Sequence, residues 1–169
     1  GLMETLYFND GPDKDKIHEI PNLGSVGWTS FESAFFKCGS LTTVAGGDTS
    51  GVTSMERMFA QAANVSPDTS GWDTSSVTIM ENMFGGTTVA NPDTSGWDIS
   101  SVTNMEFMFS GTGAANPDTS NWDTSSVSSM QHMFYQAASA NPQTGGWDPS
   151  SIGNMVAMFH GAASANPDT

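Results

Sequence analysis

The sequence predicts a repeat solenoid whose coils each contain a short extended segment and a short helix. Tryptophan returns every 25 residues, at Trp72, Trp97, Trp122 and Trp147. A Met-x-x-Met-Phe motif keeps the same period and ends at Phe59, Phe84, Phe109, Phe134 and Phe159. A fixed period of this length is typical of solenoids, in which each coil buries its apolar face against the next coil.

The chain divides into three parts. Residues 1–27 lack the repeat, and we expect them to cap the first coil, which would otherwise expose its core. A linker, or part of a preceding domain, is the alternative. Residues 28–47 form a degenerate first coil, in which Cys38 is expected to be a buried small apolar residue. Residues 48–169 are regular 25-residue repeats, and we expect them to be truncated at the C-terminus.

Each regular coil has two halves, as the unit from Asn91 to Ala115 illustrates. Pro92 fixes its own φ and biases Asn91 toward extended geometry, which predicts an extended first half. From Asp98 to Gly111, apolar residues return at helical spacing, which predicts a short helix. A helix of about 10 residues is marginal alone, so packing on neighbouring coils must hold it.

The charge of the chain excludes several classes of function. The formal net charge is -14, from 18 acidic and 4 basic residues, and no Lys or Arg follows Arg57. Such a surface repels phosphate backbones and anionic lipids, so we expect neither nucleic-acid binding nor binding to a membrane surface. No apolar run is long enough to cross a membrane, and a single cysteine excludes an internal disulfide framework.

The string W-D-x-S-S-V-x-x-M-x-x-M-F, which runs for example from Trp97 to Phe109, resembles the repeat of BspA-like leucine-rich-repeat surface antigens of bacteria. The segment Phe35-x-x-Cys38-x-x-Leu41-x-x-Val44 resembles the same family, and the resemblance covers residues 31–169. It implies a leucine-rich-repeat-like, right-handed α/β coil on the outside of a cell, used for adhesion and without catalytic residues. Small or polar residues replace the family's large apolar ones at Ala90 and Thr94, so the strand side of the core is expected to be thinner.

Two columns of aspartates could carry chemistry. The first comprises Asp48, Asp73, Asp98, Asp123 and Asp148, and we interpret it as a capping ladder with a metal column as the alternative. The second comprises Asp68, Asp93, Asp118 and Asp168 and is broken by Gln143. We expect a solvated acidic face there, and the alternative is a metal site in which Ca²⁺ bridges coils through Asp68, Asp93 and Asp118. No other cofactor is expected.

The Asn-Pro-Asp-Thr-Ser half of the repeat supplies the predicted binding residues. These are the exposed columns Asp68, Asn91, Asp93, Ser95, Asn116, Asp118, Ser120 and Asn141. Regular amide and hydroxyl groups, including Thr94 and its equivalents, could contact sugars or ice, and the alternative is that they form an internal ladder. His132 and His160 fall in different columns, so a zinc site is not expected.

These observations predict a non-enzymatic, extracellular adhesion module at the cell surface, and no catalytic site. Its expected partner is a host or neighbouring-cell surface protein or a glycan, and the piece itself is expected to be monomeric. The alternatives are a stiff spacer that Ca²⁺ could stabilise, and an ice-binding or carbohydrate-binding face on the Thr and Asn columns.

Overall fold

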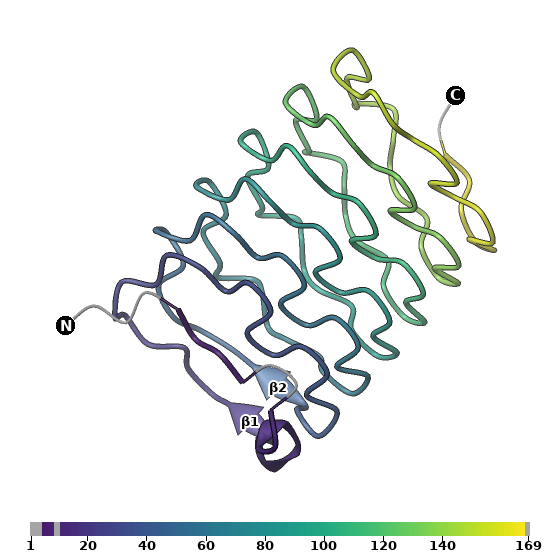
Figure 1. The fold of residues 1–169 in the computed structure, drawn as a ribbon. Coiled ribbons are helices and arrows are strands. Elements are labelled where there is room, and N and C mark those ends of the chain that lie inside the picture. Colours follow the sequence, from purple (N-terminus) through teal and green to yellow (C-terminus); the bar gives the residue numbers. More distant parts are fainter. Residues whose placement is uncertain (1–4, 9–10, 168–169) are drawn as a thin grey trace.

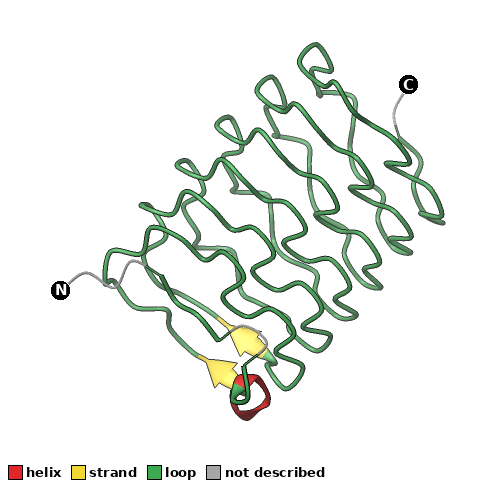
Figure 2. Ribbon diagram, in the orientation of Figure 1, coloured by secondary structure: helices red, strands yellow, loops and turns green. Residues whose placement is uncertain are grey.

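The chain winds through successive coils that stack side by side along one axis (Figure 1). The computed structural model describes residues 5–8 and 11–167. Within them, three regular elements occur: the 3-10 helix η1 (Lys14–Lys16) and the strands β1 (Glu19–Ile20) and β2 (Thr43–Val44). The two strands pair in parallel, and the coils themselves consist of turns and irregular segments (Figure 2).

Neighbouring coils are joined in parallel register. An isolated bridge links each coil to the next, through Thr5, Ser30, Ser54, Ile79, Asn104, Ser129 and Asn154. Successive partners are 24 or 25 residues apart, which is the period of the sequence motifs. Equivalent residues therefore lie beside each other and form columns that run along the stack.

The segment from Asp98 to Gly111 forms consecutive turns and not the helix that its periodicity predicts. The backbone N–H of Phe107 donates to the Gln131 carbonyl of the next coil at 3.0 Å, so it is not available for a helical bond. Phe107 and Gly111 also adopt left-handed φ values of 56° and 68°, which an α-helix does not contain. Contacts between coils override the local helical preference, while the apolar face of the segment still points inward.

From Met105 to Gly111, the backbone hydrogen bonds between coils all have one direction. In the peptide unit that joins Asn104 to Met105, the carbonyl accepts from Met80 of the preceding coil, and the N–H donates to Ser129 of the following coil. The pattern repeats at every second peptide unit of the segment, with the intervening units closing turns such as Met108 N–H to the Met105 carbonyl. In this part of each coil, backbone N–H groups therefore face the following coil, and backbone carbonyl groups face the preceding coil.

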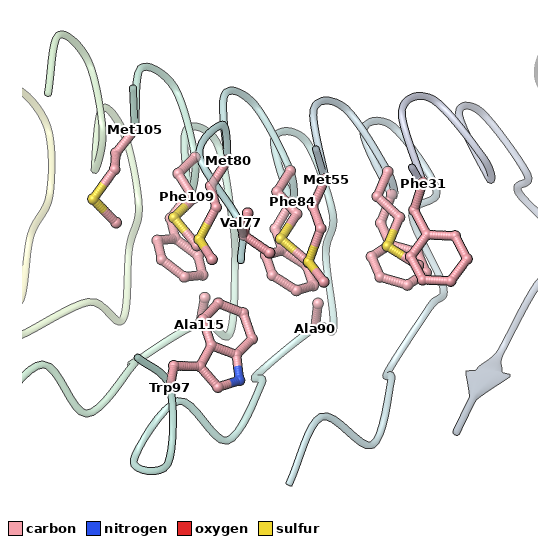
Figure 3. Packing of buried hydrophobic residues seen from close by; sticks show 14 of the residues in the cluster. Phe31, Met55, Val77, Met80, Phe84, Ala90, Trp97, Met105, Phe109 and Ala115 are labelled. Carbon is pink, nitrogen blue, oxygen red and sulfur yellow. The ribbon is translucent and has the colours of Figure 1, made fainter. Parts of the chain in front are cut away.

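A continuous ladder of rings fills the core. Phe35, Phe59, Phe84, Phe109, Phe134 and Phe159 stack with ring centroids 5.5 or 5.6 Å apart. Methionine, valine and tryptophan side chains surround the ladder, and Ala90 and Ala115 line its opposite side (Figure 3). These alanines leave room for the tryptophans, whose bulk restores the close packing that a folded interior needs.

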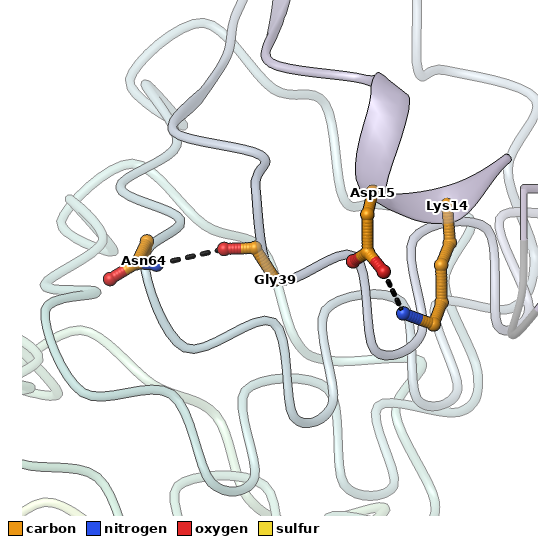
Figure 4. A network of polar contacts seen from close by, with 4 residues as sticks. All are labelled: Lys14, Asp15, Gly39 and Asn64. Carbon is orange, nitrogen blue, oxygen red and sulfur yellow. Dashed lines mark hydrogen bonds and ion pairs between the residues drawn. The ribbon is translucent and has the colours of Figure 1, made fainter.

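Residues N-terminal to the first full coil cover its open side. Phe8 N–H donates to the Ala34 carbonyl, and the Phe8 ring stacks on Phe35 at 6.0 Å. Thr42 N–H donates to the His18 carbonyl, so the covering segment is hydrogen-bonded to the first full coil as neighbouring coils are to each other. Near η1, Lys14 pairs with Asp15, and Asn64 reaches back one coil to the Gly39 carbonyl at 2.8 Å (Figure 4).

Candidate functional site

Both aspartate columns hold the turns of their own coils. Asp93 accepts from the backbone N–H and the hydroxyl of Ser95 through the same carboxylate oxygen, at 3.0 and 2.7 Å. Asp98 and Ser100 repeat this arrangement in the first column. These bonds hold the pKa of each carboxyl below its usual value of 3.8, first through the serine hydroxyl and then through the serine N–H. Every described regular coil therefore uses its aspartates as turn caps.

Acidification is expected to destabilise the protein. A carboxyl whose pKa is lowered by folding contributes stability above its unfolded value of 3.8, and that contribution is lost as the pH falls through the folded pKa. The denaturation midpoint in urea should therefore fall between about pH 5 and about pH 3. Ser100→Ala, which removes the hydroxyl donor of Asp98, should reduce this dependence. Ser139→Ala is the matched control, because that hydroxyl donates to the Gly113 carbonyl. A midpoint that stays constant or rises in acid would contradict the prediction.

The asparagine and threonine columns join one coil to the next. Asn116 N–H donates to the side-chain oxygen of Asn91, and Asn141 N–H donates to that of Asn116, both at 2.8 Å. Thr94 is only 1% exposed, and its hydroxyl donates to the Asp118 carbonyl at 2.7 Å. The threonine hydroxyls therefore point into the stack, so a face for ice or sugar would have to be built from other groups.

Three of the predicted binding residues meet at a shallow hollow on the surface. Asn116, Asp118 and Ser120 line it together with Pro117 and Gln143, and its volume is about 450 Å³. Gln143 interrupts the aspartate column here, and its side-chain amide donates to the Asn141 carbonyl at 3.1 Å. The predicted residues Asp68, Asn91, Asp93 and Ser95 lie in the same columns along earlier coils, and Asp168 lies outside the described residues. Among the described residues, no group of three or more His, Cys, Asp or Glu is placed to hold a metal ion, and the calcium site at Asp68, Asp93 and Asp118 stays a prediction.

Non-repeating residues gather on a different part of the coil, the edge formed by the turns. Two positions there have a left-handed backbone in each coil, and one of them is occupied in turn by Ser33, Arg57, Asn82, Phe107, His132 and Ala157. The residues inside the stack repeat faithfully, whereas the residues at this position share no side-chain chemistry. We call this surface the turn edge.

Four rings form a cluster on the turn edge. Phe107 and His132 stack with centroids 4.8 Å apart and planes 2° apart, and Tyr135 and His160 stack at 5.3 Å and 13°. His132 also meets Tyr135 edge to face at 5.3 Å, so the four rings are one group. The His132 Nδ1 atom is buried without a hydrogen-bond partner. We call Phe107, His132, Tyr135 and His160 the edge cluster.

A second aromatic site lies near the other end of the turn edge. Lys37 Nζ lies 4.9 Å from the centre of the Phe36 ring, and Arg57 Cζ lies 4.7 Å from it. The adjacent column is acidic, and burial, Glu81 and Glu32 together raise the pKa of Glu56, while Arg57 lowers it. The turn edge thus combines aromatic rings with negative charge.

Sequence reasoning missed the edge cluster because it looked for columns of identical residues. His132 and His160 do fall in different columns, yet Tyr135 joins them through its two ring contacts. The signal that could have found the cluster is the opposite of the repeat, namely positions that change in every coil. In a repeated scaffold, such positions are free of packing constraints and can be used for contacts with other molecules.

Comparison with known proteins identifies a family. The chain matches the family described as Mycoplasma protein of unknown function, DUF285, over residues 29–144 and again over residues 53–169. The two matches are displaced by one coil, as a repeated sequence allows. No curated protein and no solved structure matches the chain, and no described helix is long and apolar enough to cross a membrane. The chain therefore belongs to the DUF285 family of Mycoplasma proteins, which agrees with its resemblance to bacterial surface repeats.

Proposed function

We propose that this chain is a non-enzymatic binding module on the outside of a cell, built as a leucine-rich-repeat-like solenoid that presents ligand contacts on its turn edge. The observation that carries the proposal is the edge cluster. Four rings from three coils gather at positions where the repeat is not kept, on a chain whose formal net charge is -14. Aromatic side chains supply large contact area at low entropic cost, so they are enriched where proteins bind partners.

The repeated columns support the scaffold in this proposal. Their aspartates cap turns, and their asparagines and threonines join coils, so Asp93 Oδ1, Asn91 Oδ1 and the Thr94 hydroxyl are engaged within the protein. The hollow at Asn116 and Asp118 is a secondary contact surface. Adhesion to a host or neighbouring-cell protein or to a glycan remains the class of function.

A stiff spacer is the second candidate, and the continuous hydrogen-bond ladder favours it. Each coil is joined to the next through backbone hydrogen bonds along the turn segment and through side-chain ladders elsewhere. Such a stack resists bending, because bending would have to break several bonds at each step.

Binding to an array of glycans and host surface proteins separates the two functions. The triple variant F107A/Y135A/H160A should lose the hits, while Val89→Ala, which changes an exposed residue outside the edge cluster, should keep them. Hits that persist in the triple variant would overturn the turn edge as the site. A folded wild-type protein with no hits would favour the spacer. If neither EDTA nor millimolar Ca²⁺ changes the melting temperature, a spacer that is stabilised by calcium is excluded.

A further inference from the structure

The two aromatic sites of the turn edge occupy equivalent places in the coil. Phe36 N–H closes a turn onto the Ser33 carbonyl, and Tyr135 N–H closes the same turn onto the His132 carbonyl. Ser33 and His132 have left-handed φ values of 53° and 54°. Phe36 and Tyr135 are thus the same position in different coils.

The cations around Phe36 have no counterparts around Tyr135. Lys37 follows Phe36 directly, and the equivalent residue after Tyr135 is Gln136, with φ values of 59° and 55°. Arg57 comes from the next coil, where Ser33 N–H donates to the Glu56 carbonyl. The corresponding bond from His132 reaches Val156, so Ala157 stands where Arg57 stands.

The charge of this half of the molecule sharpens the contrast. No Lys or Arg follows Arg57 in the sequence, so no side chain of the C-terminal coils can place a fixed cation on the edge cluster. Glu106 directly precedes Phe107 and accepts a hydrogen bond from Ser129, and its column continues as the uncharged Gln131 and Val156. A ring with negative charge beside it, as Phe107 has, attracts cations, because the face of an aromatic ring is itself negative.

We propose that the edge cluster binds an arginine side chain of a basic protein partner, through a cation–π contact of the kind that Arg57 makes with Phe36 within the chain. The inference rests on the proposed binding function and names its ligand class. A guanidinium is favoured over an ammonium because it is planar, stacks on aromatic faces and is less strongly hydrated. The net charge of -14 draws a basic partner toward the surface, and the rings then select arginine.

Peptide binding tests the inference. Two fluorescent peptides of equal charge, one with two arginines and one with two lysines separated by glycine, are titrated with the full chain at physiological ionic strength. The arginine peptide should bind about fivefold more tightly, which is the preference that a stacked cation supplies. The double variant Y135A/H160A should reduce this preference to about one.

A variant that supplies an arginine from within the chain provides a more direct test. Ala157→Arg places an arginine beside the edge cluster, at the position equivalent to Arg57, and it should block the arginine peptide. Ala157 already has a left-handed φ of 51°, so the substitution adds no new backbone strain. Val89→Arg is the matched control, because it adds the same charge at an exposed position outside the cluster.

The outcomes separate this inference from the proposed function. Loss of the arginine preference in Ala157→Arg but not in Val89→Arg supports it. Equal binding of both peptides, with equal effects of the two variants, overturns it and leaves only general attraction to an acidic surface. Array hits that depend on the edge cluster but are not displaced by the arginine peptide also overturn it, while the binding function stands with another ligand.

Discussion

Phe109→Ala should destabilise the protein by about 3–5 kcal/mol, the range found when a fully buried phenylalanine is truncated. Phe109 has no exposed surface, and its ring stacks between Phe84 and Phe134 at 5.6 Å on each side. Removing the ring opens a cavity in the middle of the ladder and separates the coils on either side of it. Urea denaturation, with amide hydrogen exchange to locate the loss of protection, measures the effect.

Phe107→Ala is the matched control, because it removes the same ring two residues away on the outside of the same coil. Phe107 is partly exposed and stacks on one ring, His132. Its loss should cost about 0.5–1.5 kcal/mol, the usual value of an aromatic pair. Equal effects of the two variants would mean that the apolar face of this segment does not point inward.

Gly47→Ala should destabilise the protein by about 2–4 kcal/mol, from left-handed strain and overpacking together. Gly47 has a φ of 90°, and a Cβ added there would lie 2.5 Å from Leu23 Cβ and 3.1 Å from the Gly24 carbonyl oxygen. Those atoms belong to the backbone or lie next to it, so no side-chain rotation relieves the clash. The substitution should push the covering segment away from the coil, which hydrogen exchange at Leu23 and its neighbours would report.

Gly71→Ala is the control for replacing a glycine with alanine where no clash or left-handed strain arises. A Cβ at Gly71 meets no atom within 4 Å, and the backbone there is not left-handed. Alanine at this position should leave stability unchanged or raise it by about 0.5 kcal/mol, because it restricts the unfolded chain. If Gly47→Ala behaves like Gly71→Ala, the segment at Leu23 does not lie against residue 47.

The edge cluster changes where function is sought on this chain. The Asn-Pro-Asp-Thr-Ser half supplies the regular polar groups. The buried hydroxyl of Thr94 joins its coil to the next, and the Asp93 carboxylate holds a turn of its own coil. The turn half carries the core on one side and singular residues on the other. Phe107 and Phe109, two residues apart, illustrate both sides.

The sequence by itself determined the period, the register and the inward face. Trp97, Met105 and Phe109 and their equivalents keep the same spacing in every regular coil. Each fills the same place in its coil, so its position in the repeat is fixed. The capping role of the Asp98 column could also be predicted, because an aspartate two residues before a serine N–H has a local partner. These features depend on short distances along the chain or on exact repetition.

Only the tertiary structure decided the backbone of the turn segment and the composition of the edge cluster. Val102, Met105 and Phe109 have helical spacing, but the N–H groups of Met105, Phe107 and Phe109 bond to the next coil and not to a carbonyl four residues back. His132 and His160 become neighbours of Tyr135 because coils stack in register, which places residues 25 positions apart side by side. Hydrogen bonds between coils satisfy every second peptide unit of this segment, and that long-range gain outweighs the local preference for a helix.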